Sequence, residues 1–116
     1  MIGFSSNLRV FVAVGTTDLR RGFDGLAQIA RDVLQQDPLA GHLFVFSNRR
    51  RDRIKILYWD GSGFALWMKR LERGNFYWPA ADAASHELST GELAALLGGI
   101  DLNKTQRRLR YVRPVA

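Results

Sequence analysis

The fold of this chain is decided by residues 53–71, which read Arg53-Ile-Lys-Ile-Leu-Tyr-Trp-Asp-Gly-Ser-Gly-Phe-Ala-Leu-Trp-Met-Lys-Arg-Leu71. Two runs rich in aromatic and aliphatic residues, each with basic residues, flank a Gly-Ser-Gly segment, which is the pattern of two strands joined by a tight turn. We expect one strand over residues 53–60 and the next over residues 64–71. The stretch therefore predicts a β-hairpin.

The register of this hairpin determines which side chains face solvent. A three-residue loop at 61–63 would group the apolar residues of both strands against a helix. A two-residue loop would mix the two sets and bury a charge, so the three-residue loop is favoured. The expected inner face consists of Ile54, Ile56, Tyr58, Phe64, Leu66 and Met68. The expected outer face collects Arg53, Lys55, Trp59, Trp67 and Lys69.

The remaining patterns predict a small α+β domain. Further strands are expected at Leu8–Val14 and Leu43–Ser47, with a short edge strand at Phe76–Pro79 and a loop over residues 80–87. The strands would form a small, mostly antiparallel sheet with hairpins. One longer helix would follow the first strand and one short helix would lie near the C-terminus, both packed on one face of the sheet.

Two sequence signals predict these helices. Apolar residues recur at helical spacing after the first strand, at Phe23, Leu26, Ala27, Ala30, Val33 and Leu34. Asp37-Pro38 would end that helix. Near the C-terminus, Ser89 and Glu92 have the spacing of a capping box, and Gly98-Gly99 would end the short helix.

Length and composition limit the class of protein. The 116 residues suit one domain, which we expect over residues 1–102, followed by a basic tail over 103–116. The absence of cysteine excludes disulfides and thiolate metal sites. No apolar run reaches the length of a membrane-spanning helix, and the N-terminus lacks the pattern of a signal peptide, so we expect a cytoplasmic protein.

The charge distribution favours a nucleic-acid partner. The net charge is +6, and most of the basic residues are arginine, which binds phosphate bidentately and stacks on aromatic rings. Arg49 to Arg51 form a consecutive basic run at the expected tip of a hairpin. The candidate DNA-binding residues are Arg49, Arg50, Arg51, Arg53, Lys55, Trp59, Trp67, Lys69, Arg70 and Arg73. Exposed charge is also common for solubility alone, and an aromatic, arginine-rich face is typical of protein interfaces as well.

No motif for catalysis or for a cofactor stands out. The two histidines, His42 and His86, lack a second histidine at metal-binding spacing. The carboxylates considered for a metal site are Asp18, Asp24, Asp60 and Glu72. Their positions suit helix caps, a turn and an ion pair better than a two-metal centre. We therefore expect a protein that is not an enzyme and has no metal or cofactor.

Several long segments resemble one known family. They are Asp18–Leu26, Gly41–Phe46, Asn48–Lys55, Tyr58–Gly61, Gly63-Phe64, Lys69–Gly74 and Trp78-Pro79. Together they are similar to the small accessory protein, often called TnpB or Orf2-like, of the insertion-sequence-66 group of bacterial mobile elements. The similarity covers residues 8–79, and the segment 93–101 also looks similar, whereas the tail after residue 103 matches least.

The resemblance implies a role in transposition beside a separate transposase, which carries the catalytic carboxylates. The family is not assigned an enzymatic activity, so its name supplies a pathway rather than a mechanism. Two hypotheses follow from the residues. The chain binds DNA through its arginine-rich hairpin and a basic aromatic sheet face, or it docks on the transposase through that same face without contacting DNA.

Overall fold

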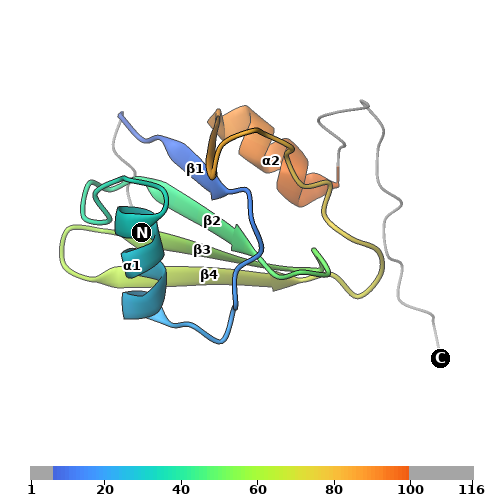
Figure 1. Cartoon of the computed structure of the whole chain (residues 1–116), viewed down its shortest axis with the longest axis horizontal. Helices are drawn as coiled ribbons and strands as arrows, with labels where there is room; N and C mark the ends of the chain where they lie inside the picture. The colour runs from blue at the N-terminus through green and yellow to red at the C-terminus, as the bar shows by residue number, and fades with distance from the viewer. Residues whose placement is uncertain (1–6, 100–116) are drawn as a thin grey trace.

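The structure, a computed structural model, describes residues 7–99, which form a five-stranded sheet with two helices (Figure 1). The elements are β1 (Val10–Ala13), α1 (Phe23–Asp32), β2 (Leu43–Ser47), β3 (Arg53–Trp59), β4 (Phe64–Arg70), β5 (Ser85–Leu88) and α2 (Thr90–Gly98). This arrangement confirms the expected α+β class, with the longer helix after the first strand and a short helix near the C-terminus. The expected end of the domain at residue 102 and the tail over 103–116 lie outside the described residues.

The strand order is β4-β3-β2-β1-β5, and every neighbouring pair is antiparallel except β1 with β2. Parallel strands need a crossover, because the chain must return to the starting end of the sheet. The crossover here contains α1, which therefore covers one face. The mostly antiparallel sheet was predicted correctly, but its parallel pair was not foreseen.

The two helices lie on opposite faces of the sheet, so the expectation that both pack on one face was wrong (Figure 1). All four residues of β1 are buried, and a strand that is apolar on both sides needs cover on both sides. The α1 side contains Phe11, Ala13, Leu26, Ala27, Ala30, Leu34, Phe44, Phe46 and Leu57. The α2 side contains Val10, Val12, Val45, Ile54, Ile56, Phe76, Leu88, Leu93 and Leu96.

The register of the hairpin between β3 and β4 differs by one residue from the predicted register. Trp59 lies opposite Phe64, and the Asp60 N–H donates to the Gly63 carbonyl at 3.1 Å, so the loop is the shorter one that the sequence argument rejected. The Asp60 carboxylate accepts from the Ser62 N–H, the Ser62 hydroxyl and the Gly63 N–H, and Gly61 adopts a φ of 99°. These bonds favour the short loop because the Asp60 carboxylate satisfies the N–H groups of the two residues that complete the turn.

The corrected register divides the predicted outer face between the two sides of the sheet. Trp67 and Lys69 lie on the α2 side with Ile54 and Ile56, whereas Arg53, Lys55 and Trp59 lie on the α1 side with Phe64, Leu66, Met68 and Arg70. The observed register places Lys69 on the α2 side, where its ammonium group donates to the Leu97 carbonyl of α2 at 3.0 Å. The hydrophobic argument failed because it assumed one solvent-facing side.

Three further expectations need correction. Phe23 and Val33, which were placed on the core face of the first helix, are 47% and 51% exposed. Phe76–Pro79 forms no strand, although Phe76 and Pro79 are buried against the sheet. The expected loop over residues 80–87 contains the start of β5, because pairing with the open edge of β1 outweighs the weak strand propensity of Ser85–Leu88.

The start and end of α2 were predicted correctly. The Ser89 hydroxyl accepts from the Glu92 N–H, and the Glu92 carboxylate accepts from the Ser89 N–H, both at 3.0 Å. Gly99 ends the helix in the left-handed conformation, with φ at 86°. Local hydrogen bonding therefore sets both ends of the helix.

The register can be tested by cross-linking, since the chain contains no cysteine. Lys55 and Met68 lie directly opposite each other at a non-hydrogen-bonded position, where side chains come closest. We expect the double variant Lys55→Cys/Met68→Cys to form an intramolecular disulfide, measured by mass spectrometry of the unreduced protein. The matched control Lys55→Cys/Lys69→Cys places the thiols on opposite faces and should stay reduced. Cross-linking of the control alone would support the rejected register.

Candidate nucleic-acid interface

One end of the sheet gathers most of the candidate residues; we call it the loop end. It consists of the loops 14–22, 48–52 and 71–84 together with the adjoining strand residues Arg53 and Arg70. Backbone hydrogen bonds hold these segments together: Thr17 N–H to the Ser47 carbonyl at 2.9 Å, Leu71 N–H to the Asp52 carbonyl at 2.7 Å, and Phe76 N–H to the Arg51 carbonyl at 2.6 Å. The loop end is therefore a built surface rather than a set of separate loops.

The hairpin between β2 and β3 presents its arginines from a rigid turn. The Asn48 side-chain oxygen accepts from the N–H groups of Asp52 and Arg53, at 3.2 and 3.1 Å, and its amide nitrogen donates to the Asp52 carboxylate at 2.6 Å. These bonds close the turn from inside. Arg49 and Arg50 lie at its tip with exposed side chains.

Arg51 differs from its two neighbours, because its side chain turns back onto the protein. It adopts a positive φ of 57°, and its guanidinium donates to the Val14 carbonyl at 2.9 Å. The same group lies 4.9 Å from the centre of the Trp78 ring, whose N–H donates to the Ala13 carbonyl at 3.2 Å. Burial lowers the pKa of the Arg51 guanidinium. Arg51 therefore joins β1, the hairpin and the segment after β4.

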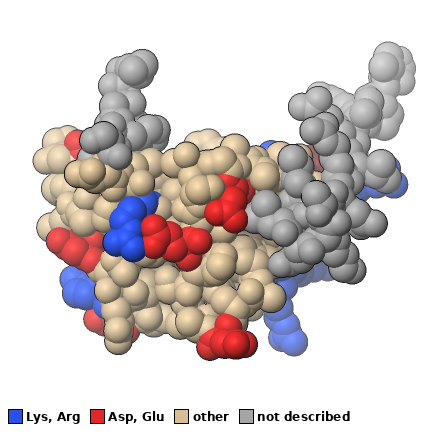
Figure 2. Space-filling model, turned by 90° about the horizontal axis from the view of Figure 1, so that it is seen from above, with Lys and Arg blue, Asp and Glu red and all other residues tan. Residues whose placement is uncertain are grey.

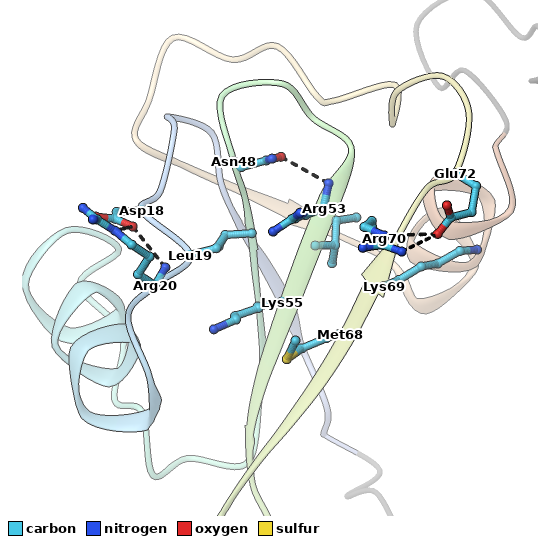
Figure 3. Close-up of a pocket in the computed structure, with 11 residues that line it drawn as sticks. Asp18, Leu19, Arg20, Asn48, Arg53, Lys55, Met68, Lys69, Arg70 and Glu72 are labelled. Atoms are coloured by element: carbon cyan, nitrogen blue, oxygen red, sulfur yellow. Dashed lines mark hydrogen bonds and ion pairs between the residues drawn. The ribbon is translucent and has the colours of Figure 1, made fainter.

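A groove of about 670 Å³ opens beside the start of β3 (Figure 3). Its polar lining residues are Asp18, Arg20, Asn48, Arg53, Lys55, Lys69, Arg70 and Glu72. Figure 3 shows Asp18 and Arg20 on one wall, Arg70 and Glu72 on the other, and Arg53 between them. Arg53 and Arg70 are directly opposite in the two strands, so the corrected register brings them together.

Two ion pairs neutralise part of this groove. Arg20 contacts Asp18 at 2.7 Å, and hydrogen bonding to Arg20 lowers the pKa of the Asp18 carboxyl to about 2. Arg70 contacts Glu72 at 2.9 Å. The Lys55 ammonium donates to the Arg21 carbonyl at 3.0 Å. Arg53 is exposed, and within residues 7–99 its guanidinium has no hydrogen bond or ion pair, so it is the groove cation most available to a phosphate.

The structure brings some predicted site residues together and separates others. Arg49, Arg50, Arg51, Arg53, Arg70 and Arg73 lie at the loop end, and Lys55 lies further along β3 in the groove. Trp59 is at the far end of β3, about 20 Å from Arg53 along the strand, and its ring packs edge-on against Phe64. Trp67 lies on the α2 side of the sheet, and so does Lys69, although Lys69 also borders the groove. The expected stacking platform of two tryptophans beside the arginines therefore does not form.

Other residues at the loop end were not among the predicted DNA-binding residues. Arg20 and Asp18 line the groove, and Trp78 stacks on Arg51. The basic pair Arg20-Arg21 and the Trp78-Pro79 segment are visible in the sequence, but only the fold places these residues beside the hairpin. On the face shown in Figure 2, acidic and basic side chains are interspersed over a mostly uncharged surface, so charge does not gather there.

The described residues contain neither a group of metal-binding side chains nor a membrane-spanning helix. Among residues 7–99, no three His, Asp or Glu side chains converge in a way that could hold a metal ion. No helix in that part of the chain is long and apolar enough to cross a membrane.

Comparison with known proteins gives a family and two relatives. The model of the IS66 Orf2 like protein family matches residues 8–107. The chain is 42% identical over 110 residues to the uncharacterized protein y4hO of Sinorhizobium fredii, covering 95% of this chain and 96% of that protein. It is 40% identical over 108 residues to the uncharacterized protein y4jC of the same organism, covering 93% and 92%. No solved structure matches the chain.

The role of Arg51 can be separated from the backbone conformation of its turn. Glycine at this position relieves the left-handed conformation, which would stabilise the fold by about 1–2 kcal/mol if the side chain did nothing. Loss of the charged hydrogen bond and of the stacking costs about 2–4 kcal/mol. From the middle of each range, we therefore expect Arg51→Gly to lower the free energy of unfolding in urea by about 1.5 kcal/mol overall. Arg49→Ala is the control and should change it by less than about 0.5 kcal/mol. An Arg51→Gly variant more stable than wild type would contradict the anchoring role.

Proposed function

Since the chain belongs to the IS66 Orf2-like family and is an insertion-sequence accessory protein, we propose that it binds DNA at the loop end of its sheet and catalyses no reaction itself. The observation that carries this proposal is the set of exposed arginines there that lack an acidic partner among the described residues. They include Arg49, Arg50, Arg53 and Arg73. A phosphate backbone is the ligand class that suits such a surface, because guanidinium groups bind phosphate bidentately.

The electrostatics of the loop end support phosphate contacts rather than base readout. Four arginines that each neutralise one phosphate would give a salt slope of about −3.6. Affinity would then fall roughly 150-fold between 50 and 200 mM salt. Neither of the tryptophans nearest these arginines in the sequence offers a free stacking face, since Trp78 already stacks on Arg51 and Trp59 lies at the other end of β3. We therefore favour binding that depends weakly on base sequence.

The uses of the carboxylates support a role without catalysis. Asp18 pairs with Arg20, Glu72 pairs with Arg70, and Asp60 accepts the hydrogen bonds of its own turn. In the described part of the chain, these carboxylates do not come together in a group that could hold a metal ion. In this proposal the chemical steps on the DNA strands are carried out by the separate transposase of the same element, in the bacterial cytoplasm.

DNA binding is tested by fluorescence anisotropy of labelled duplex and single-stranded DNA, titrated from low to physiological salt. We expect Arg49→Ala/Arg50→Ala to reduce the salt slope by about 1.8 units and to weaken binding at low salt. The matched control is Arg9→Ala/Arg31→Ala, which removes the same charge from two ion pairs, with Glu87 and Asp32, away from the loop end. The control should keep most of the slope.

Two results would count against this proposal. Equal effects of the two double variants would mean that net charge, rather than the loop end, governs binding. Wild-type protein that binds no DNA at low salt would remove the DNA-binding function altogether. Circular dichroism of each variant confirms that the comparison is made between folded proteins.

A further inference from the structure

The free edge of the sheet at β4 is long and partly apolar. β4 is the last strand in the sheet order, with β3 as its one partner among the described residues, and it is seven residues long (Figure 1). It contains no proline. Trp67 is 46% exposed and Met68 is 64% exposed. Such an edge is a template for another strand unless charges, proline or a bulge protect it, and its only charges are the last two residues, Lys69 and Arg70.

The hydrogen bonds at the two ends of the hairpin show which groups of β4 point outward. The Leu71 N–H donates to Asp52, and the Asp60 N–H donates to Gly63. Because bonded and non-bonded positions alternate in an antiparallel pair, Ala65, Trp67 and Lys69 exchange hydrogen bonds with β3. The N–H and C=O groups that point away from the sheet therefore belong to Phe64, Leu66, Met68 and Arg70.

We propose that this edge pairs with the β4 of a second copy of the chain, in an antiparallel arrangement centred on Trp67, so that the two five-stranded sheets become continuous. The two-fold axis passes between the Trp67 residues. Leu66 lies opposite the partner's Met68, and Phe64 lies opposite the partner's Arg70. The four residues of these two pairs have backbone groups that point outward, so each strand satisfies the hydrogen-bonding groups of the other.

The avoidance of like-charge contacts favours this register. Centring on Trp67 pairs all seven residues of the strand, and it sets Lys69 and Arg70 opposite the partner's Ala65 and Phe64. Centring on Lys69 would place two ammonium groups face to face, which is unfavourable. The Lys69 ammonium also stays bound to the Leu97 carbonyl, and the small side chain of the partner's Ala65 leaves room for that bond.

The α2 side of the new junction would be filled by the two tryptophans. Trp67 occupies a hydrogen-bonded position towards β3 and therefore a non-hydrogen-bonded position towards the second copy, where facing side chains come closest. The exposed indole of each copy would pack on the other. On the α1 side, Leu66 and Met68 of the two copies would form a second apolar contact. The proposal thus explains why the large exposed side chains of β4 lie at its middle.

The symmetry of the pair gives a specific test in this cysteine-free chain. Only the residue on the two-fold axis meets its own copy, so Trp67→Cys should form an intermolecular disulfide under mild oxidation. Ala65→Cys and Lys69→Cys, two residues to either side on the same face, are the matched controls and should stay monomeric on a non-reducing gel. Cross-linking through residue 65 or 69 instead of 67 would overturn the register.

Sedimentation equilibrium of the unmodified full chain tests association itself. We expect twice the monomer mass of 13.1 kDa, and a monomer for Met68→Pro, which removes an outward N–H without removing a bond to β3. Met68→Thr keeps that N–H and should remain dimeric. Circular dichroism shows whether the proline variant is folded, and Trp67→Lys, which opposes two charges at the axis, is the second disrupting variant. A monomer at all concentrations, or a dimer that none of these changes affects, would overturn the proposal.

Discussion

The contact between Arg51 and Trp78 holds the loop end together. The guanidinium stacks on the indole ring and donates to the Val14 carbonyl, while the indole N–H binds the Ala13 carbonyl. These interactions join the end of β1, the hairpin after β2 and the segment that leaves β4. Without them the turn that carries Arg49 and Arg50 would lose its hydrogen bond to the Val14 carbonyl and its contact with the Trp78 ring.

The local signals in the sequence gave correct elements wherever the cause of the structure is local. The capping box at Ser89 and Glu92 set the start of α2, and the aromatic and aliphatic runs around Gly61-Ser62-Gly63 predicted two strands. The register of those strands depends on what covers each face, which is a tertiary property. Because α1 and α2 lie on opposite sides, grouping the apolar residues on one face led to the wrong register.

The sequence indicated which types of residue form the candidate site, but not how their side chains are arranged. The basic run of residues 49–51 is uniform in sequence, yet a positive φ at Arg51 turns that side chain inward while its neighbours stay exposed. Arg53 and Arg70 face each other only in the observed register. Trp59 and Trp67 look alike in the sequence. In the structure, Trp59 lies at the far end of β3 from the arginines, and Trp67 lies on the α2 side of the sheet.

The position of β1 between β2 and β5 affects how the chain folds during synthesis. Val10 pairs with Leu43 on one side and with Leu88 on the other, so one strand depends on residues from both halves of the chain. Contacts of such long sequence separation form slowly, because a large loop must close first. At ribosomal rates, β1 would wait on the order of ten seconds for β5. Throughout that interval the nascent chain exposes the edge of a strand whose four residues are all buried in the folded protein.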